Sequence, residues 1–340
     1  MDDLLFSYAD PATSPMRRRV IRMIEVATGQ RELKALYLDN QRNPVPSESF
    51  WQAAVRRLKL DVRYDAAALE RMPRQGSVVV VANHPYGVLD GIVISWLIEK
   101  VRTDFLVLTN AVLLRAPEVR DFVLPVDFSE TEEARQINLR SRAAARSHLD
   151  KGGCVVVFPA GGVSTAPDRL GRKPAVDAPW QPFTAQLIQR SKATVVPICF
   201  SGQNSRLFQI ASHLSLTLRL SLIFREVRNR MGTVLPVAIG DPIAFEVLAP
   251  IKDRAALVQE LRNRTYGLAN LPSGAVVPRS WKRSKSGPLG YIGRPGAGDD
   301  EGVPKRAAAV LQAWDEASRP HAKRPGWIRR RVTPRQPRPR

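Results

Sequence analysis

The sequence predicts an α/β protein whose central sheet is mostly parallel and flanked by helices. Compact apolar runs, typical of strands buried on both faces, alternate with stretches long enough for helices. This alternation favours parallel strands, because a crossover between two parallel strands needs a connection of helical length. Ligands bind such sheets beyond the carboxyl ends of the strands, so the residues that follow each run are the first candidates for a site. The predicted strands are SVVVVAN, DFLVLT, CVVVF, ATVVPICF and VLPVAIG, and the predicted helices are 90–101, 129–150, 180–192 and 252–268.

Helices are also expected before the sheet. Residues 17–60 carry apolar side chains at helical spacing, interrupted at 44–47 by the sequence Pro-Val-Pro-Ser. From Leu58 the apolar pattern changes to period two, which predicts a strand. Further along the chain, Ser129 and Glu132 have the spacing of a capping box, which would start the second helix of the α/β part.

The C-terminal part has a different composition. After about Pro278 the chain is rich in Pro, Gly, Ser and Arg, with one short helical candidate at 306–317, and we expect it to be largely disordered. The predicted organisation is therefore an N-terminal amphipathic helical segment (1–57), an α/β domain (58–278) and a basic, Pro- and Arg-rich tail (279–340).

The charge of the chain predicts an anionic partner. The formal net charge is +20, and the tail alone holds sixteen Lys and Arg against five Asp and Glu. Nucleic acid, anionic lipid and phosphorylated small molecules all fit such a charge. The tail contains no recognisable nucleic-acid-binding module, so we expect no dedicated nucleic-acid partner.

Cysteine content and hydropathy suggest a cytoplasmic protein. Cys154 and Cys199 lie within apolar runs, which suits buried reduced thiols. The N-terminus is acidic and lacks the apolar stretch of a secretory signal, and the longest apolar runs fall short of the roughly 20 residues that span a bilayer. We expect a protein that lies on the inner face of a membrane without crossing it.

The first candidate site residues follow the run SVVVVAN. His84 stands at the carboxyl end of this predicted strand, and Asp90 stands where the next helix would begin. A carboxylate that orients an imidazole enables it to take a proton from an attacking hydroxyl or amine. Gly87 would let the connecting loop turn tightly. Alternatively, Asp90 is only a helix cap and His84 only bonds to the backbone of a turn.

Two further predicted strands run into polar or Gly-rich loops. After CVVVF come Gly161 and Gly162, whose loop could hold an oxyanion or phosphate with its backbone N–H groups. After ATVVPICF come polar side chains, among them Arg206, which could line a binding crevice. Three strand ends thus predict one site.

The segments NHPYGVLDG, VVVFPAGGVS and VVPICFSGQNSRLF, in this order, resemble the glycerophospholipid acyltransferase family, which includes lysophosphatidic acid acyltransferases. The similarity is greatest to its hemolysin-like branch, which includes lyso-ornithine lipid acyltransferases, and it covers roughly residues 20–268. The resemblance implies that acyl-CoA or acyl carrier protein donates a fatty acyl group to a hydroxyl of a lysolipid at the membrane surface, with no metal and no bound cofactor. It assigns His84 as the base, Asp90 as its orienting carboxylate, and Pro197 to the family's fourth motif. The acceptor- or oxyanion-binding motif would comprise Phe158, Pro159, Gly161, Gly162 and Ser164.

The sequence departs from the family pattern in two places. Five residues separate His84 from Asp90, whereas four are usual, and Gly87 could absorb the extra one. The second motif reads FPAGGVS where FPEGTRS is commoner, so Ala160 replaces a Glu and no Arg follows the glycines. This departure argues against lysophosphatidic acid and for another lysolipid, such as lyso-ornithine lipid, as the acceptor.

Arginines are the candidates for contacts with phosphates or a lipid head group, because the guanidinium group binds these groups through two parallel hydrogen bonds. The basic amphipathic stretch 15–27 and the tail are candidates for membrane contact, although the stretch would serve equally well as a solvated helix over the core. The strong positive charge would also attract an acidic acyl carrier protein. The candidate arginines are Arg115, Arg135, Arg140 and Arg206.

Two alternatives to an active acyltransferase remain, and a third is excluded. A catalytically lapsed relative would hold lipid or acyl carrier without transferring the acyl group. The altered spacing and the missing Glu, replaced by Ala160, make this interpretation credible. A nucleic-acid-associated protein would depend entirely on the tail. An α/β hydrolase is excluded because the chain has no Gly-x-Ser-x-Gly sequence.

Overall fold

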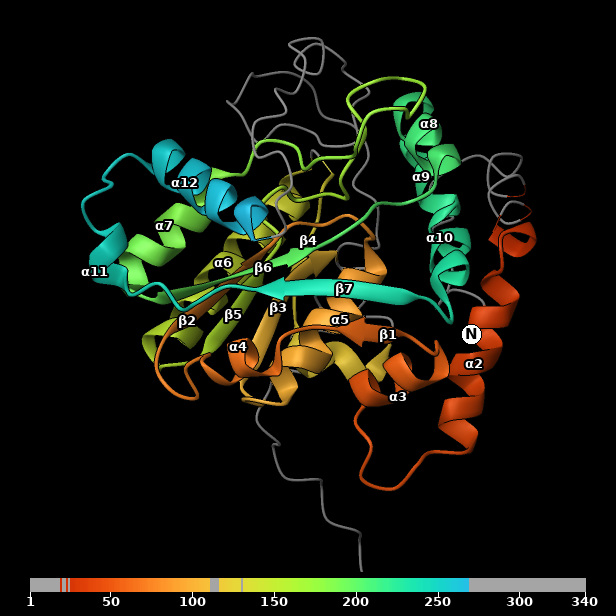
Figure 1. Ribbon diagram of the computed structural model, residues 1–340, viewed down its shortest axis with the longest axis horizontal. Coiled ribbons are helices and arrows are strands. Elements are labelled where there is room, and N and C mark those ends of the chain that lie inside the picture. The colour runs from red at the N-terminus through yellow and green to blue at the C-terminus, as the bar shows by residue number, and fades with distance from the viewer. Residues whose placement is uncertain (1–18, 20–22, 24, 111–115, 130, 269–340) are drawn as a thin grey trace, which may run out of the picture. The chain divides into compact units, whose positions relative to one another are not determined.

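The computed structural model describes residues 19, 23, 25–110, 116–129 and 131–268, which build one central sheet with helices on both faces (Figure 1). The predicted tail, its helical candidate at 306–317 and most of the stretch 15–27 lie outside the described residues. The strands are β1 (Asp61–Arg63), β2 (Val78–Ala82), β3 (Phe105–Asn110), β4 (Val123–Val126), β5 (Cys154–Val157), β6 (Thr194–Phe200) and β7 (Val234–Ile239).

The sheet is mostly parallel, as predicted. The strand order is β1-β7-β6-β2-β5-β3-β4, and the five strands from β6 to β4 are parallel to one another. Only the β6–β7 pair is antiparallel, and β1 pairs with β7 in parallel. The three strands whose loops were predicted to form a site, β6, β2 and β5, are therefore direct neighbours with the same direction.

Each central strand is buried on both faces by a different set of helices. In β2, Val78, Val80 and Ala82 join the core with α2, α3, α5, α8 and α10, whereas Val79 and Val81 join the core with α6, α7 and α12. This placement explains why the strands are continuous runs of Val, Ile and Leu. The helices are α2 (Gln30–Arg42), α3 (Phe50–Arg57), α4 (Ala66–Glu70), α5 (Val88–Glu99), the 3₁₀ helix η3 (Pro117–Phe122), α6 (Glu132–Asp150), α7 (Pro182–Ser191), α8 (Arg206–Leu214), α9 (Leu216–Ser221), α10 (Ile223–Arg230), α11 (Phe245–Leu248) and α12 (Arg254–Gly267).

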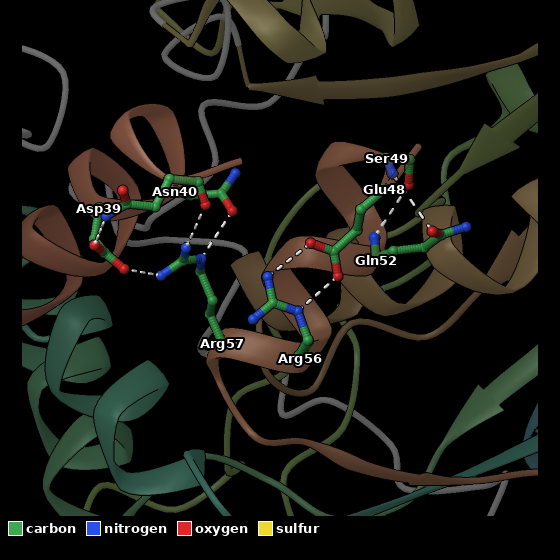
Figure 2. A network of polar contacts seen from close by, with 8 residues as sticks. Asp39, Asn40, Glu48, Ser49, Gln52, Arg56 and Arg57 are labelled. Carbon is green, nitrogen blue, oxygen red and sulfur yellow. Dashed lines mark hydrogen bonds and ion pairs between the residues drawn. The ribbon is translucent and has the colours of Figure 1, made fainter. Parts of the chain in front are cut away.

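The N-terminal helices α2 and α3 pack on the core and are joined by polar contacts. Arg57 at the end of α3 bonds to Asp39 and Asn40 of α2, while Arg56 forms an ion pair with Glu48 (Figure 2). Trp51 is buried in the same apolar cluster as β2. The segment before the sheet is therefore part of the same core.

One local prediction was wrong. Ser129 does not cap the helix that follows it; its N–H and hydroxyl both bond to Asp127. The N-cap is Thr131, whose hydroxyl accepts a hydrogen bond from the N–H of Ala134 at 3.2 Å, so the helix α6 begins at Glu132. Both residues are good caps, and the turn formed with Asp127 decides between them.

Both cysteines are free and buried, as predicted. Among the residues that the structure describes, no helix combines the length and hydrophobicity that crossing a bilayer requires.

Candidate active site

The candidate site lies at the carboxyl ends of β2, β5 and β6. The side chain of Asn83, directly after β2, accepts a hydrogen bond from the N–H of Phe200 at 2.7 Å and donates one to its carbonyl at 2.9 Å. The hydroxyl of Tyr86 donates to the carbonyl of Ser201 at 2.6 Å. The loop that carries His84 is thereby fixed against the end of β6.

His84 and Asp90 face each other. Nδ1 of His84 lies 3.1 Å from Oδ2 of Asp90, and the same oxygen accepts hydrogen bonds from the N–H groups of Tyr86 at 2.8 Å and Gly87 at 2.9 Å. Gly87 has a φ of 75°, a conformation that side-chain-bearing residues rarely adopt. The longer spacing therefore still brings the two side chains together. The turn at Gly87 accommodates the extra residue, as the sequence suggested. Asp90 also bonds to the start of α5, so it serves both as a helix cap and as the partner of His84.

Burial governs the electrostatics of this pair. Asp90 is fully buried, and this burial raises the pKa of its carboxyl group, opposed by His84 and by the two backbone N–H donors. The side chain of His84 keeps 18% of its surface exposed. With Nδ1 turned to Asp90, Nε2 is the ring nitrogen that can accept a proton from a bound hydroxyl.

The loop after β5 packs on the histidine loop. The ring of Phe158 lies 4.2 Å from that of His84, centroid to centroid, and the N–H of Ser164 donates to the carbonyl of His84 at 2.8 Å. Gly161 has a φ of 70° and bonds to the carbonyl of Phe158, which closes a tight turn. The carbonyl of Pro159 accepts from the N–H of Gln181 at 2.9 Å, so this residue fixes the base of the turn. The structure thus brings Phe158, Pro159, Gly161, Gly162 and Ser164 to the side of His84, with Gly162 half-buried between them.

Asp177 is a residue of this site that sequence reasoning missed. Its buried carboxylate accepts hydrogen bonds from the N–H of His84 at 3.2 Å, the hydroxyl of Ser164 at 2.5 Å and the indole of Trp180 at 2.9 Å. Burial raises the pKa of Asp177, and the hydrogen bonds oppose this effect. His84 is therefore held through its N–H by Asp177 and through its carbonyl by Ser164. No motif surrounds Asp177; only its acidity within the otherwise apolar sequence AVDAPW could have singled it out.

A cavity of about 160 Å³ adjoins the histidine loop and the loop after β6. It lies between the end of β2, the segment before Asp177 and the loop after β6, so a small group bound there would be next to the residue that follows His84. Its lining comprises Asn83, Pro85, Pro174, Ala175, Val176, Gly202, Gln203 and Tyr266.

The predicted arginines are spread over the chain. Arg135 forms an ion pair with Glu132 on the exposed face of α6, and Arg140 is exposed on the same helix. Arg206 begins α8 and donates to the carbonyl of Leu170 at 2.9 Å. Arg115 lies outside the described residues. None of the described arginines of this set contacts His84 or Asp90.

Pro197 lies inside β6, buried and close to Gly240. It is not among the residues that line the cavity, so its position is that of a core residue behind the site. Within the described part of the chain, no cluster of three His, Cys, Asp or Glu side chains could hold a metal ion.

The carboxyl edge of the sheet thus carries a histidine in contact with a buried carboxylate, an arrangement suited to taking a proton from a hydroxyl. Comparison with known families agrees: a family described as acyltransferase matches residues 26–273, and the chain belongs to this acyltransferase family. The resemblance inferred from the three motifs is confirmed at this level.

Two curated relatives carry the name lyso-glycine lipid O-acyltransferase. The one from Phocaeicola vulgatus is 25% identical over 262 residues, 74% of this chain and 88% of the relative. The one from Bacteroides thetaiotaomicron is 24% identical over 220 residues, 62% of this chain and 76% of the relative. Among solved structures, the 1-acyl-sn-glycerophosphate acyltransferase of Thermotoga maritima is similar with a TM-score of 0.40 and 16% identity, covering 75% of this chain and 80% of that one.

Proposed function

We propose that this acyltransferase moves a fatty acyl group from acyl-CoA or acyl carrier protein to a hydroxyl of a lysolipid, with His84 as the general base. The single observation that carries the proposal is the 3.1 Å contact between His84 and Asp90 beside the Gly-rich loop. The names of the curated relatives support a lysolipid acceptor, and more narrowly one whose head group is an amino acid.

The reaction needs no covalent acyl-enzyme. Nε2 of His84 takes the proton of the acceptor hydroxyl as its oxygen attacks the thioester carbonyl. The carbon–sulfur bond then breaks, and the leaving thiolate receives the proton from the imidazolium. Asp90 stabilises the imidazolium between these two steps.

The developing oxyanion needs donors near His84. None of the described residues accepts a hydrogen bond from the backbone N–H of Gly162 or Val163. These two groups, on the turn beside Phe158, are the candidates for stabilising the oxyanion.

The membrane surface is the second part of the proposal. The loop between Ser164 and Asp177 packs against α8 and carries Leu170, which is 50% exposed. On the adjoining helix α8, Leu207 and Leu214 are 44% and 72% exposed. Cationic side chains surround Leu170, since Arg169, Arg172 and Lys173 are all exposed. Exposed leucines among cations fit an anionic bilayer, which supplies both apolar and charged contacts.

The first experiment measures transfer of labelled acyl groups from acyl-CoA and from acyl carrier protein to a panel of lysolipids. We expect His84→Ala to lower the transfer rate by about 10²–10⁴-fold, the usual contribution of a general base. His148→Ala is the matched control, because His148 bonds to Asp104 at the amino ends of the strands. Binding of lysolipid without transfer, unchanged in His84→Ala, would instead favour a lapsed, lipid-holding protein.

The membrane part is tested by flotation with vesicles of phosphatidylcholine, with and without phosphatidylglycerol. Leu170→Asp should weaken binding to the anionic vesicles on the order of tenfold or more, because a leucine is lost and a negative charge is added. Leu139→Asp is the control, since Leu139 is 48% exposed on α6. Equal binding by both variants and the wild type would rule out this surface.

A further inference from the structure

A buried arginine lies beside the proposed site. Arg219 of α9 has only 5% of its surface exposed. Its guanidinium group donates a hydrogen bond to the carbonyl of Val163 and lies 5.4 Å from the centroid of the Phe208 ring. Among the residues that the structure describes, no carboxylate forms an ion pair with it.

A buried cation without a counter-ion is unfavourable. Desolvation penalises the charged form and is usually compensated by a carboxylate or by several hydrogen bonds. Burial lowers the pKa of Arg219 to about 10, so the guanidinium group is still protonated at neutral pH. One carbonyl and one ring face leave most of its five N–H donors available to another group.

The position of Arg219 links this charge to the candidate site. Val163 stands between the Gly-rich turn and Ser164, whose N–H bonds to the carbonyl of His84. A side chain built on Gly87 would meet Val163 and Ile223, each at 3.0 Å, so the Gly-rich loop and the segment that follows Arg219 both pack on the histidine loop. Arg219 brings a guanidinium group to the Gly-rich loop from a helix more than fifty residues further along the chain.

We propose that Arg219 is the anion-binding residue of this active site and takes a carboxylate or phosphate group of a substrate. The inference rests on the proposed acyl transfer. The anion has two possible sources, the head group of the acceptor and the phosphates of the donor. A guanidinium group suits both, because it binds a planar carboxylate or a phosphate through two parallel hydrogen bonds.

The test compares Arg219→Gln and Arg219→Lys with the wild type on matched substrate pairs. The acceptor pair is a lysolipid with a free carboxylate in its head group and the methyl ester of the same lipid. The donor pair is acyl-CoA and S-acyl pantetheine, which lacks the phosphates. Arg225→Gln is the matched control, since it removes the same charge from α10, the next helix.

We expect Arg219→Gln to raise the KM for the charged member of one pair on the order of 10- to 100-fold, the usual effect of losing a charge-assisted hydrogen bond. The uncharged member should change less than about threefold, and Arg219→Lys should be intermediate because it keeps the charge but loses the two-bond geometry. A selective loss in the acceptor pair identifies the acceptor as the source of the anion; one in the donor pair identifies the donor.

A binding measurement separates this inference from the proposed reaction. Inorganic phosphate should raise the Tm of the wild type and of Arg225→Gln, but not that of Arg219→Gln, because only a bound ligand stabilises the folded state. If the wild type transfers no acyl group, the proposed reaction fails and the phosphate measurement still decides the role of Arg219. If Arg219→Gln does not fold, Arg219→Lys answers the same questions.

Equal losses for charged and uncharged substrates would make Arg219 a structural residue of the loop and overturn the inference. An unchanged KM for all four substrates, or the same phosphate stabilisation in wild type and variant, would overturn it as well.

Discussion

Two equally buried arginines at opposite ends of the sheet have opposite surroundings. Arg102, at the amino ends of the strands, is 6% exposed and forms two hydrogen bonds with Asp104, at 2.7 and 2.6 Å. It also donates to the carbonyls of Pro73, Gly76 and Gly152. Arg219, near the carboxyl ends, has one carbonyl and one ring face.

The pKa values of the two arginines shift in opposite directions because only Arg102 has a carboxylate partner among the described residues. The hydrogen bonds with Asp104 raise the pKa of Arg102, whereas burial lowers that of Arg219. A fully paired buried charge holds loops together, and an unpaired one indicates a place for a ligand. The amino end of the sheet is therefore expected to control stability, and the carboxyl end to control the reaction.

The largest effect expected at the carboxyl end comes from Asp90→Asn. The amide cannot stabilise an imidazolium as a carboxylate does, so kcat/KM should fall on the order of 10³-fold. The Tm should change little, because the new amide keeps an oxygen that can accept from the N–H groups of Tyr86 and Gly87. Steady-state kinetics measure kcat/KM, and a thermal melt of the same sample measures Tm. A large fall in Tm with normal kcat/KM would remove the distinction between the two ends.

At the amino end, Arg102→Met should lower stability with little effect on the reaction. The change leaves the carbonyls of Gly76 and Gly152 without their donor, and we expect a loss of about 2–4 kcal/mol in the free energy of unfolding. Urea denaturation measures this loss, and kcat at a temperature where the variant is folded provides the control. A reduced kcat in fully folded Arg102→Met would show that this end also shapes the site.

Gly87→Ala tests the loop between the two catalytic side chains. A Cβ there would approach Val163 and Ile223 at 3.0 Å, and the φ of 75° is strained for alanine. We expect a loss of about 1–3 kcal/mol in stability together with a lower kcat, because the contact between His84 and Asp90 depends on this turn. Gly76→Ala is a control with a φ of 82° and nothing within 4 Å of the added carbon. If both variants lose the same stability and neither loses activity, the close approach at Gly87 has no role.

The smallest effect is a change in the pH dependence of stability, with opposite signs at the two ends. The pKa of Asp177 is raised in the folded state by burial, so the folded state holds this proton longer than the unfolded state. Stability from this group is therefore lost as pH rises from about 4, the unfolded pKa, through the folded pKa. Asp104 has a lowered pKa because of Arg102, so its contribution is present above about pH 4 and is lost as pH falls.

Melts between about pH 3 and pH 8 follow both contributions. Asp177→Asn should remove a fall in Tm with rising pH, and Asp104→Asn should remove a rise. A parallel change of the pH profile in both variants would contradict the opposite signs.

Much of the fold could be predicted because strands that are buried on both faces have continuous apolar sequences. The strand β4, with the short sequence Val-Leu-Pro-Val, was missed because Pro125 disfavours a strand assignment. The helices α8 to α10 were not predicted, although residues 206–230 contain many apolar side chains; only the polar residues 201–205 before them form the expected loop. The antiparallel direction of β7 depends on packing that no local pattern records.

The site was predicted only as far as its motifs extend. His84, Asp90 and the Gly-rich turn occupy strand ends, where local sequence and position in the sheet agree. Asp177 and Arg219 belong to segments without a motif, and each reaches the site through a hydrogen bond to a residue far away in the chain. A contact of this kind is visible only in three dimensions.

The turn at Gly87 has a consequence for recognising relatives of this protein. A search that counts residues between the histidine and the aspartate would separate chains with four intervening residues from this one, although its five residues still bring the carboxylate within 3.1 Å of Nδ1. Loop length and residue type should instead vary together: a chain with the longer loop needs glycine, or failing that asparagine, three positions after its histidine. The contact between the histidine and the aspartate can therefore identify a relative even where an inserted residue changes the count between them.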